Sequence, residues 1–289
     1  MKRKKEGLVA LDVQTLVNDS TKIGTLPSIF YEINDAIEDP EASFSRIGNI
    51  ISGDAALSAR LLKIVNSSFY SFETKVETVT HAITIVGLAQ LRELVLATKV
   101  ISQFAGVPKN VVDMEAFWGH SIACGLAAKI IAIYRREPNA ERYYVKGILH
   151  DVGRLVLFLN APEQMKKILE LRVKGGLLHE VEMDVLGFDH AEVGCALAEK
   201  WGLHPDLGNS VRYHHSPSMK DEYLLSAGIV HLADVIAHAL QLGGSGEPHV
   251  LPLDEKIFPS IDLPVNLMAS IITQVDRQYD DAVQMFRSA

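Results

Sequence analysis

Apolar residues recur at helical spacing along almost the whole chain, and a sustained alternation of apolar and polar residues, the pattern of a half-buried strand, is missing. A chain with this single periodicity must bury its apolar stripes by packing helix against helix. With 289 residues, 48% of them hydrophobic, the chain is long enough to form a substantial core in one or two domains. The periodicity therefore predicts an all-α fold.

Residues that favour helix ends divide these apolar stretches. Ser43, Asp54 and Pro162 each stand where a stretch begins, as N-terminal helix residues do. Glycine or proline follows three stretches, at Gly106 and Pro108, at Gly175 and Gly176, and at Gly243 and Gly244. The segment AGVPKN, residues 105–110, is the best internal boundary, and it divides the chain into two helical lobes.

This division predicts a two-lobed helical bundle with short additions at both ends. We expect an N-terminal tail and short helix over residues 1–23 and a first helical lobe over residues 24–107. A second lobe, the helical core, follows over residues 108–242. Residues 243–289 are expected to form a loop, rich in proline up to Pro264, and a last helical region near residues 265–286.

The charge balance limits the partners of the chain. The formal net charge is −8 and the isoelectric point is about 5.8, which argues against extended nucleic-acid binding because that requires a basic face. The basic run at residues 2–5 is expected to be a solvated terminus. No stretch approaches the roughly 20 uninterrupted apolar residues that cross a bilayer. We therefore expect a soluble cytoplasmic protein with no membrane contact.

Two cysteines, Cys124 and Cys195, lie inside apolar helical patterns. Small buried thiols are the expected interpretation, in preference to a redox role or a ligand role. The thiols therefore contribute little to the functional hypothesis at this level.

An ordered series of histidines and aspartates marks the second lobe. It comprises His120 in FWGHS, His150 and Asp151 in LHDVGR, His190 in FDHAEVG, His214 and His215 in YHHSP, and Asp234 in HLADVIAHA. Each residue lies on or at the end of a predicted helix, so a bundle can direct all of them to one site. Neutral imidazoles with a few carboxylates suit a divalent transition metal such as iron, manganese, nickel, cobalt or zinc. Asp151 is the candidate bridge between two ions, which would make the site dinuclear.

A single histidine on an apolar helix is more often a hydrogen-bonded core residue than a ligand, so the prediction depends on the whole series. The other histidines fit no such order. His231 and His238 share a helix face with Asp234 and are expected to support the site from outside the ligand set. Surface or capping roles are expected for His179, His204 and His249.

The ordered series resembles the HD superfamily of metal-dependent phosphohydrolases, and the first lobe resembles the HDOD family, the HD-related output domains of bacterial signalling. The likeness covers about residues 24–240. It is carried by the Leu-Pro opening in LPSIFYEI, the helix GDAALSARLLKIV, the Asn-Ser pair Asn66-Ser67 and the segment from Ala82 to Leu91. The resemblance implies an HD-like helical core over residues 108–242 and a regulatory role. For Asn66 and Ser67, capping of the preceding helix is the expected role, with a partner or ligand contact as the alternative.

Two departures separate the chain from the related HD-GYP phosphodiesterases, which cleave cyclic dinucleotides. Arg154 stands in HDVGR where that pattern has a lysine, so a flat bidentate guanidinium replaces a point charge. The Gly-Tyr-Pro loop is absent, since HHSPSMKDEY follows the histidine pair. The first lobe has its own departure from the HDOD pattern, Ala55 in place of the usual proline after Asp54, which should matter little because Asp54 can still cap its helix.

Three functions remain open at this point. The favoured one is a signalling module that binds metal and a protein partner. The second is a metal-dependent phosphohydrolase acting on a nucleotide or phosphodiester, with Asp151 and Arg154 as candidate catalytic residues. In that hypothesis one metal is held by His120, His150, Asp151 and Asp234, and the other by His190, His214, His215 and the shared Asp151. The third is nucleotide binding without cleavage, in which Lys146 and Arg154 hold phosphates. Lys146 lies four residues before His150 and Arg154 four after it, so all three are expected near one helix face. Both cations are otherwise expected to be solvent-exposed.

Overall fold

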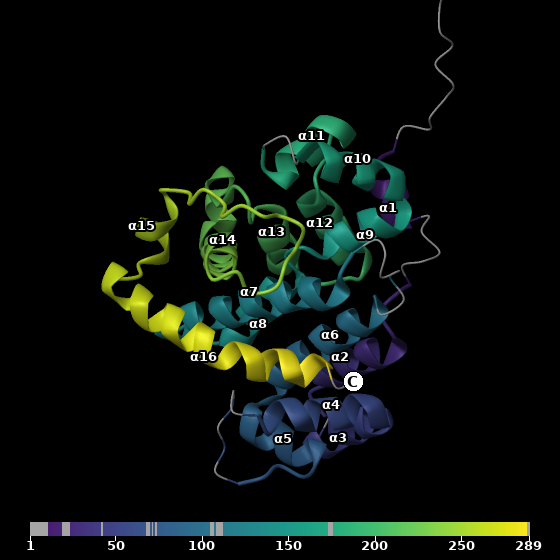
Figure 1. Cartoon of the computed structure of the whole chain (residues 1–289). Helices are drawn as coiled ribbons and strands as arrows, with labels where there is room; N and C mark the ends of the chain where they lie inside the picture. Colours follow the sequence, from purple (N-terminus) through teal and green to yellow (C-terminus); the bar gives the residue numbers. More distant parts are fainter. Residues whose placement is uncertain are drawn as a thin grey trace, which may run out of the picture.

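The computed structural model describes residues 11–18, 24–41, 43–67, 70, 72, 74–104, 107, 112–172 and 176–287. Every regular element in this part of the chain is a helix (Figure 1). The predicted all-α fold is confirmed. Most of the AGVPKN boundary segment and the basic run at residues 2–5 lie outside the described residues.

The first lobe consists of five helices that follow a short N-terminal helix. The bounds are α1 Val13–Asn18, α2 Ser28–Glu38, α3 Phe44–Ser52, α4 Ala55–Val65, α5 Val79–Val86 and α6 Leu88–Gln103. Two predicted caps are confirmed, because Ser43 accepts a hydrogen bond from the backbone N–H of Arg46 and Asp54 accepts one from that of Leu57. Helix α1 packs on α12 and α9 of the second lobe, so the N-terminal segment joins the core rather than the first lobe.

The second lobe and the C-terminal region contain the remaining elements. They are α7 Met114–Tyr134, α8 Ala140–Leu149, α9 Val152–Asn160, α10 Pro162–Arg172, α11 Leu178–Leu186, α12 His190–Lys200, α13 Pro205–Arg212, the short 3-10 helices η1 Pro217–Met219 and η2 Asp221–Tyr223, α14 Leu224–Ala239, α15 Ile257–Ile261, η3 Val265–Leu267 and α16 Met268–Arg287. Pro162 begins α10 as predicted. The prediction that residues 243–264 form a loop was wrong in one respect, because this segment contains the short helix α15.

Helix α7 is the axis of the molecule, with α8, α14 and α16 packed along it (Figure 1). It is apolar and long enough to cross a membrane by composition, but 89% of its most apolar window is buried within the protein. That burial is the behaviour of a central core helix. Buried apolar side chains of both lobes form one continuous cluster, α6 packs on α8, and α16 contacts both α7 and α4.

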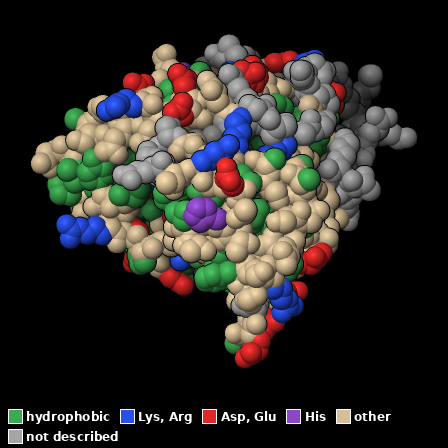
Figure 2. Space-filling model, turned by 90° about the horizontal axis from the view of Figure 1, so that it is seen from below, with side chains coloured by type: hydrophobic (Ala, Val, Ile, Leu, Met, Phe, Trp, Pro, Cys, Tyr) green, Lys and Arg blue, Asp and Glu red, His purple; other side chains and the backbone are tan. Residues whose placement is uncertain are grey.

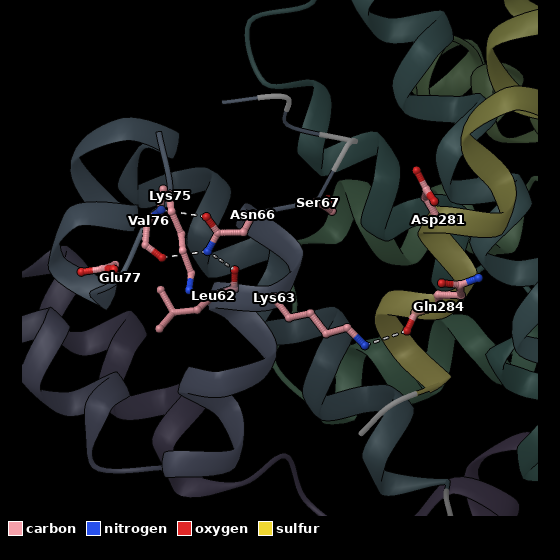
Figure 3. Close-up of a pocket in the computed structure, with 9 residues that line it drawn as sticks. All are labelled: Leu62, Lys63, Asn66, Ser67, Lys75, Val76, Glu77, Asp281 and Gln284. Atoms are coloured by element: carbon pink, nitrogen blue, oxygen red, sulfur yellow. Dashed lines mark hydrogen bonds between the residues drawn. The ribbon is translucent and has the colours of Figure 1, made fainter. Parts of the chain in front are cut away.

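The Asn-Ser motif fastens the end of α4 to the following loop. The Asn66 amide donates to the carbonyls of Leu62 (2.8 Å) and Val76 (2.7 Å), and its oxygen accepts from the backbone N–H of Val76 (2.7 Å). Ser67 donates to the carbonyl of Ile64. The capping interpretation is therefore confirmed. The motif borders a surface pocket of about 640 Å³ between α4 and α16, where the Lys63 ammonium donates to the Gln284 carbonyl (Figure 3).

The surface at the first-lobe end carries scattered charges of both signs. Viewed from below, the described part of this face has no continuous stripe of lysine and arginine (Figure 2).

Two contacts between glycines bring the helices of the second lobe close together. A Cβ on Gly147 of α8 would lie 2.5 Å from the Cα of Gly125 on α7. A Cβ on Gly153 of α9 would lie 2.6 Å from the backbone nitrogen of Gly194 on α12, and closer still to the carbonyl oxygen of His190. Backbone therefore rests directly on backbone at both crossings, which no larger residue permits.

Substitution of Gly153 by alanine should strongly destabilise the fold, because the new methyl group meets backbone atoms that cannot rotate away. We expect the free energy of unfolding in urea to fall by about 3 kcal/mol or more. Gly208→Ala in α13 is the matched control, since a Cβ there meets its nearest neighbours at 3.6 Å, an ordinary contact. An equal loss of stability in both variants would contradict the close-crossing explanation.

Candidate metal centre

The His-Asp pair lies at the bend between two helices of the second lobe. His150 caps the C-terminal end of α8 and Asp151 stands at the N-terminus of α9. The bend leaves carbonyls at the end of α8 without helical partners, and the Nδ1 of His150 donates to one of them, Gly147, over 2.6 Å. Both side chains are completely buried. The ionisable pair therefore points into the bundle.

Three imidazoles surround Asp151, one from the neighbouring His150 and two from distant parts of the chain. Its Oδ1 lies 3.0 Å from the Nε2 of His190 and 3.9 Å from the Nε2 of His214. Its Oδ2 lies 3.4 Å from the Nε2 of His150. The Nε2 of His215 lies 3.0 Å from that of His190. Helices α9 and α12 and the turn after α13 thus meet at one carboxylate.

Asp234 of α14 forms the second half of the cluster. Its Oδ1 lies 3.0 Å from the Nε2 of His120 on α7, 3.6 Å from the Nε2 of His150 and 3.3 Å from the Nε2 of His238. His150 therefore stands between the two aspartates. The structure brings together all seven residues that the sequence suggested as metal ligands.

Hydrogen bonds made by the Nδ1 atoms fix the orientation of three imidazoles. The Nδ1 of His150 donates to a carbonyl, that of His214 donates to the carbonyl of Val211 over 2.6 Å, and that of His190 donates to the buried carboxylate of Glu182. When Nδ1 carries the proton of a neutral imidazole, Nε2 presents a lone pair. The three Nε2 atoms therefore face Asp151, where each can bind a metal ion once it is deprotonated. Outer partners of this type are usual for histidines that bind metal.

Protonation is uneven across the cluster. Burial lowers the pKa of His150, but Asp151, Cys124 and Asp234 together outweigh burial and hold that pKa well above the ordinary value. Burial and Arg154 oppose protonation of His190, yet Glu182 and Asp151 raise its pKa to about 9. Burial and the neighbouring imidazoles hold the pKa of His214 well below its usual range. Without another cation, protons on His150 and His190 balance the buried carboxylates.

The donor set suits one or two divalent transition-metal ions in place of those protons. Ligands about 2.0–2.1 Å from an ion lie roughly 3–3.5 Å from one another, close to most of the separations around the two aspartates. Three buried atoms at the cluster, His150 Nε2, His214 Nε2 and Asp151 Oδ1, have no hydrogen-bond partner. Such atoms are costly to bury unless something binds them.

Three residues of the cluster were not assigned to it by the sequence. Glu182 is fully buried and holds His190, but no spacing rule links it to the histidine series. His238 was expected only as outer support. His179 was expected at the surface or as a cap, which was wrong, because its ring stacks on His215 with centroids 4.0 Å apart. His204 does cap α13, and His231 supports the site by donating to the His214 carbonyl.

Lys146 and Arg154 belong to different networks. Lys146 donates to Asp206 (2.6 Å) and Ser226 (2.9 Å), away from the cluster. Arg154 donates to Asp151 (2.8 Å) and to the carbonyl of Ser245. The expectation that both cations are solvent-exposed was wrong, since each is 2% exposed. The bend between α8 and α9 separates them, so the geometry does not support a joint phosphate site.

A pocket of about 380 Å³ adjoins the Asp234 half of the cluster. It is lined by His120, His238, Arg172 and the loop from Gly243 to Pro248. Gly243 has a positive φ of 70° and packs so closely on α7 that a Cβ there would collide with the backbone nitrogen of His120. The pocket is the approach to the cluster that the described residues leave open at His120 and His238.

The HDOD domain model matches residues 23–217, which is more than half of the chain and runs from the first lobe into the second, ending before α14. The chain belongs to the HDOD family. An uncharacterized protein from Treponema pallidum (strain Nichols) is 32% identical to this chain over 206 residues. That match covers 70% of this chain, which spans only 39% of the length of the relative.

Solved structures share the HDOD fold. An HDOD domain protein of unknown function from Geobacter sulfurreducens aligns with a TM-score of 0.77 at 23% identity, over 93% of this chain and 96% of that one. A Shewanella amazonensis SB2B protein, named for an assumed phosphohydrolase activity, aligns with a TM-score of 0.75 at 24% identity, over 95% and 97%. At these identities the likeness establishes the fold alone.

The metal-free HDOD protein should lose stability between about pH 6.5 and 9. The pKa of His190 is raised to about 9, so its contribution is fully present below the ordinary histidine pKa of about 6.5 and is lost as the pH rises through about 9. With chelator present, the free energy of unfolding in urea should fall by roughly 2–3 kcal/mol across this window. A flat or rising profile would contradict the assignment of the buried proton.

Glu182→Gln should weaken metal binding by roughly 10- to 100-fold, because the amide no longer accepts the His190 proton as a carboxylate does. Isothermal titration with zinc or manganese measures the loss. Asp184→Asn is the matched control, since Asp184 lies exposed on the same helix. Equal affinities in both variants would show that Glu182 does not act through His190.

Proposed function

We propose that this HDOD protein is a regulatory module that binds a pair of divalent transition-metal ions at the histidine and aspartate cluster. The observation that carries the proposal is the fixed orientation of His150, His190 and His214, whose Nε2 atoms converge on Asp151. Without a metal, protons on His150 and His190 balance the buried carboxylates, while the Nε2 of His214 has no hydrogen-bond partner. A divalent cation would replace those protons and bind all three nitrogens.

The arrangement supports two neighbouring positions that share Asp151. His190, His214 and His215 offer ligand atoms within 4.8 Å of one another on one side, and His120, His150 and Asp151 do so on the other. Asp234 and His238 join the second position through His120. Nitrogen-rich sets of this kind favour iron, manganese, nickel or zinc over magnesium, which prefers oxygen ligands.

A regulatory role is supported by the way the cluster is tied to the first lobe. His150 ends α8, and α8 packs on α6 of the first lobe. Gain or loss of metal at His150 therefore acts on α8, the helix that packs on α6 of the first lobe. We propose that a signalling protein binds the first lobe and senses this state.

Metal-dependent phosphohydrolysis is the second candidate, favoured by the pocket beside His120 and His238. The Nε of Arg172, which lines this pocket, is buried without a partner and is placed to hold a phosphate oxygen. A bound pair of divalent ions would supply charge neutralisation and an activated water. Arg154 would hold Asp151 in place, and a nucleotide or phosphodiester would enter from the pocket. Two structural neighbours, from Shewanella amazonensis, are named for an assumed activity of this type.

Metal content of the untagged protein tests the proposal. We expect about two iron, manganese, nickel or zinc atoms per chain by plasma mass spectrometry, and at most one in Asp151→Asn because the shared ligand is lost. His249→Gln, which changes an exposed histidine, should keep the full content. Essentially no metal after reconstitution would overturn the proposal.

Hydrolysis is tested separately on the metal-loaded protein with a panel of nucleotides and phosphodiesters. Turnover that is lost in Arg172→Gln, with metal content unchanged, would support the second candidate. Two bound metals without turnover on any member of the panel would leave the regulatory module as the function.

A further inference from the structure

Cys124 lies at the wall of the metal cluster, on the helix that carries His120. It follows His120 by four residues on α7, so both side chains lie on the same face of the helix. The Cys124 side chain is completely buried. Its Sγ, the ring nitrogen of His150 and a carboxylate oxygen of Asp234 all lie within 4.8 Å of one another.

The surroundings of Cys124 offer it little else to bind. Its thiol has a long contact of 3.8 Å to the carbonyl of Val230, a weak bond even for sulfur. The nearby Nε2 of His150 is buried and has no hydrogen-bond partner, and it points into the same space. A cation in that space would give both atoms a partner.

The close crossing of α7 and α8 explains why the sulfur comes so near. A Cβ on Gly147 would lie 2.8 Å from the carbonyl carbon of Cys124, so the α7 backbone at the cysteine rests against α8 one turn before His150. Cys195, the other cysteine, lies on α12 and contacts Glu199 instead. The approach to the cluster is therefore particular to Cys124.

We propose that Cys124 is a thiolate ligand of the ion held by His150 and Asp234. This inference rests on the proposed metal-binding function and deepens it. On binding, the Sγ–H bond breaks, a bond from Sγ to the metal forms, and the proton leaves to solvent through the pocket beside His238. Metal–sulfur distances are near 2.3 Å and metal–nitrogen distances near 2.0–2.1 Å, so ligand atoms within 4.8 Å of one another are close enough to be considered for one ion.

A sulfur ligand makes the two metal positions chemically different. The position at Cys124, His150 and Asp234 would have a sulfur, nitrogen and oxygen set, which favours zinc, cobalt or nickel. The position at His190, His214 and His215 has no sulfur and suits manganese or iron equally well. The protein would then hold two different metals, or fill one position before the other.

Cobalt(II) titration of the full chain tests the assignment, because thiolate ligation gives an intense sulfur-to-cobalt charge-transfer band in the near ultraviolet. The chain has two cysteines, so a band retained in Cys195→Ser can come only from Cys124. In Cys124→Ser we expect the band to disappear. Loss of an outer hydrogen-bond partner lowers metal affinity by roughly 10- to 100-fold. Loss of Cys124, a direct ligand in this proposal, should lower the cobalt affinity of one position by more than that. Circular dichroism checks that each variant is folded.

The outcomes separate the thiolate from the metal centre. Binding of two cobalt ions with no band in the wild type or in Cys195→Ser would overturn the role of Cys124 and leave the metal centre intact. No cobalt binding in the wild type would overturn both. If Cys124→Ser fails to fold, the band in Cys195→Ser alone decides the question.

Discussion

The direct contact of glycine backbones at two helix crossings is the constraint on which the rest of this structure depends. Gly125 and Gly147 let α8 approach α7, and Gly153 and Gly194 let α9 approach α12. These close crossings hold the helices that carry the histidines against one another, and His150, His190 and His214 reach one carboxylate. The glycines thus fix the spacing of the ligands before any ion is present, which is the kind of rigid support that precise sites need.

Much of the fold and of the cluster could be predicted from the sequence, because both depend on local signals. The caps at Ser43 and Asp54, the start of α10 at Pro162 and the helical periodicity depend on neighbours within a few residues. The ordered histidine series likewise gave the core of the cluster. Long-range pairings gave no such signal. Glu182 supports His190 only because α11 folds back over α12, and the stacking of His179 on His215 has the same cause.

The two buried cations, Lys146 and Arg154, are a second case in which the sequence did not predict the partners of a side chain. Lys146 and Arg154 are eight residues apart and appeared to share a helix face, but the chain bends at His150 and Asp151. The bend sends Lys146 toward Asp206 and Arg154 toward Asp151. A two-residue interruption in helical geometry was enough to undo a prediction that assumed a continuous helix.

The pairing of Arg154 with Asp151 has an evolutionary consequence. A neutral imidazole such as His214, whose pKa is held low by burial and the neighbouring imidazoles, can be exchanged for an apolar residue of similar volume because no charge is left behind. Loss of Asp151 alone would leave the buried guanidinium of Arg154 without its carboxylate partner. Loss of Arg154 alone would leave the buried carboxylate of Asp151 without its guanidinium partner. Descendants that abandon metal would therefore lose neutral histidines such as His214 first and would retain Asp151 and Arg154 as a remnant of the site.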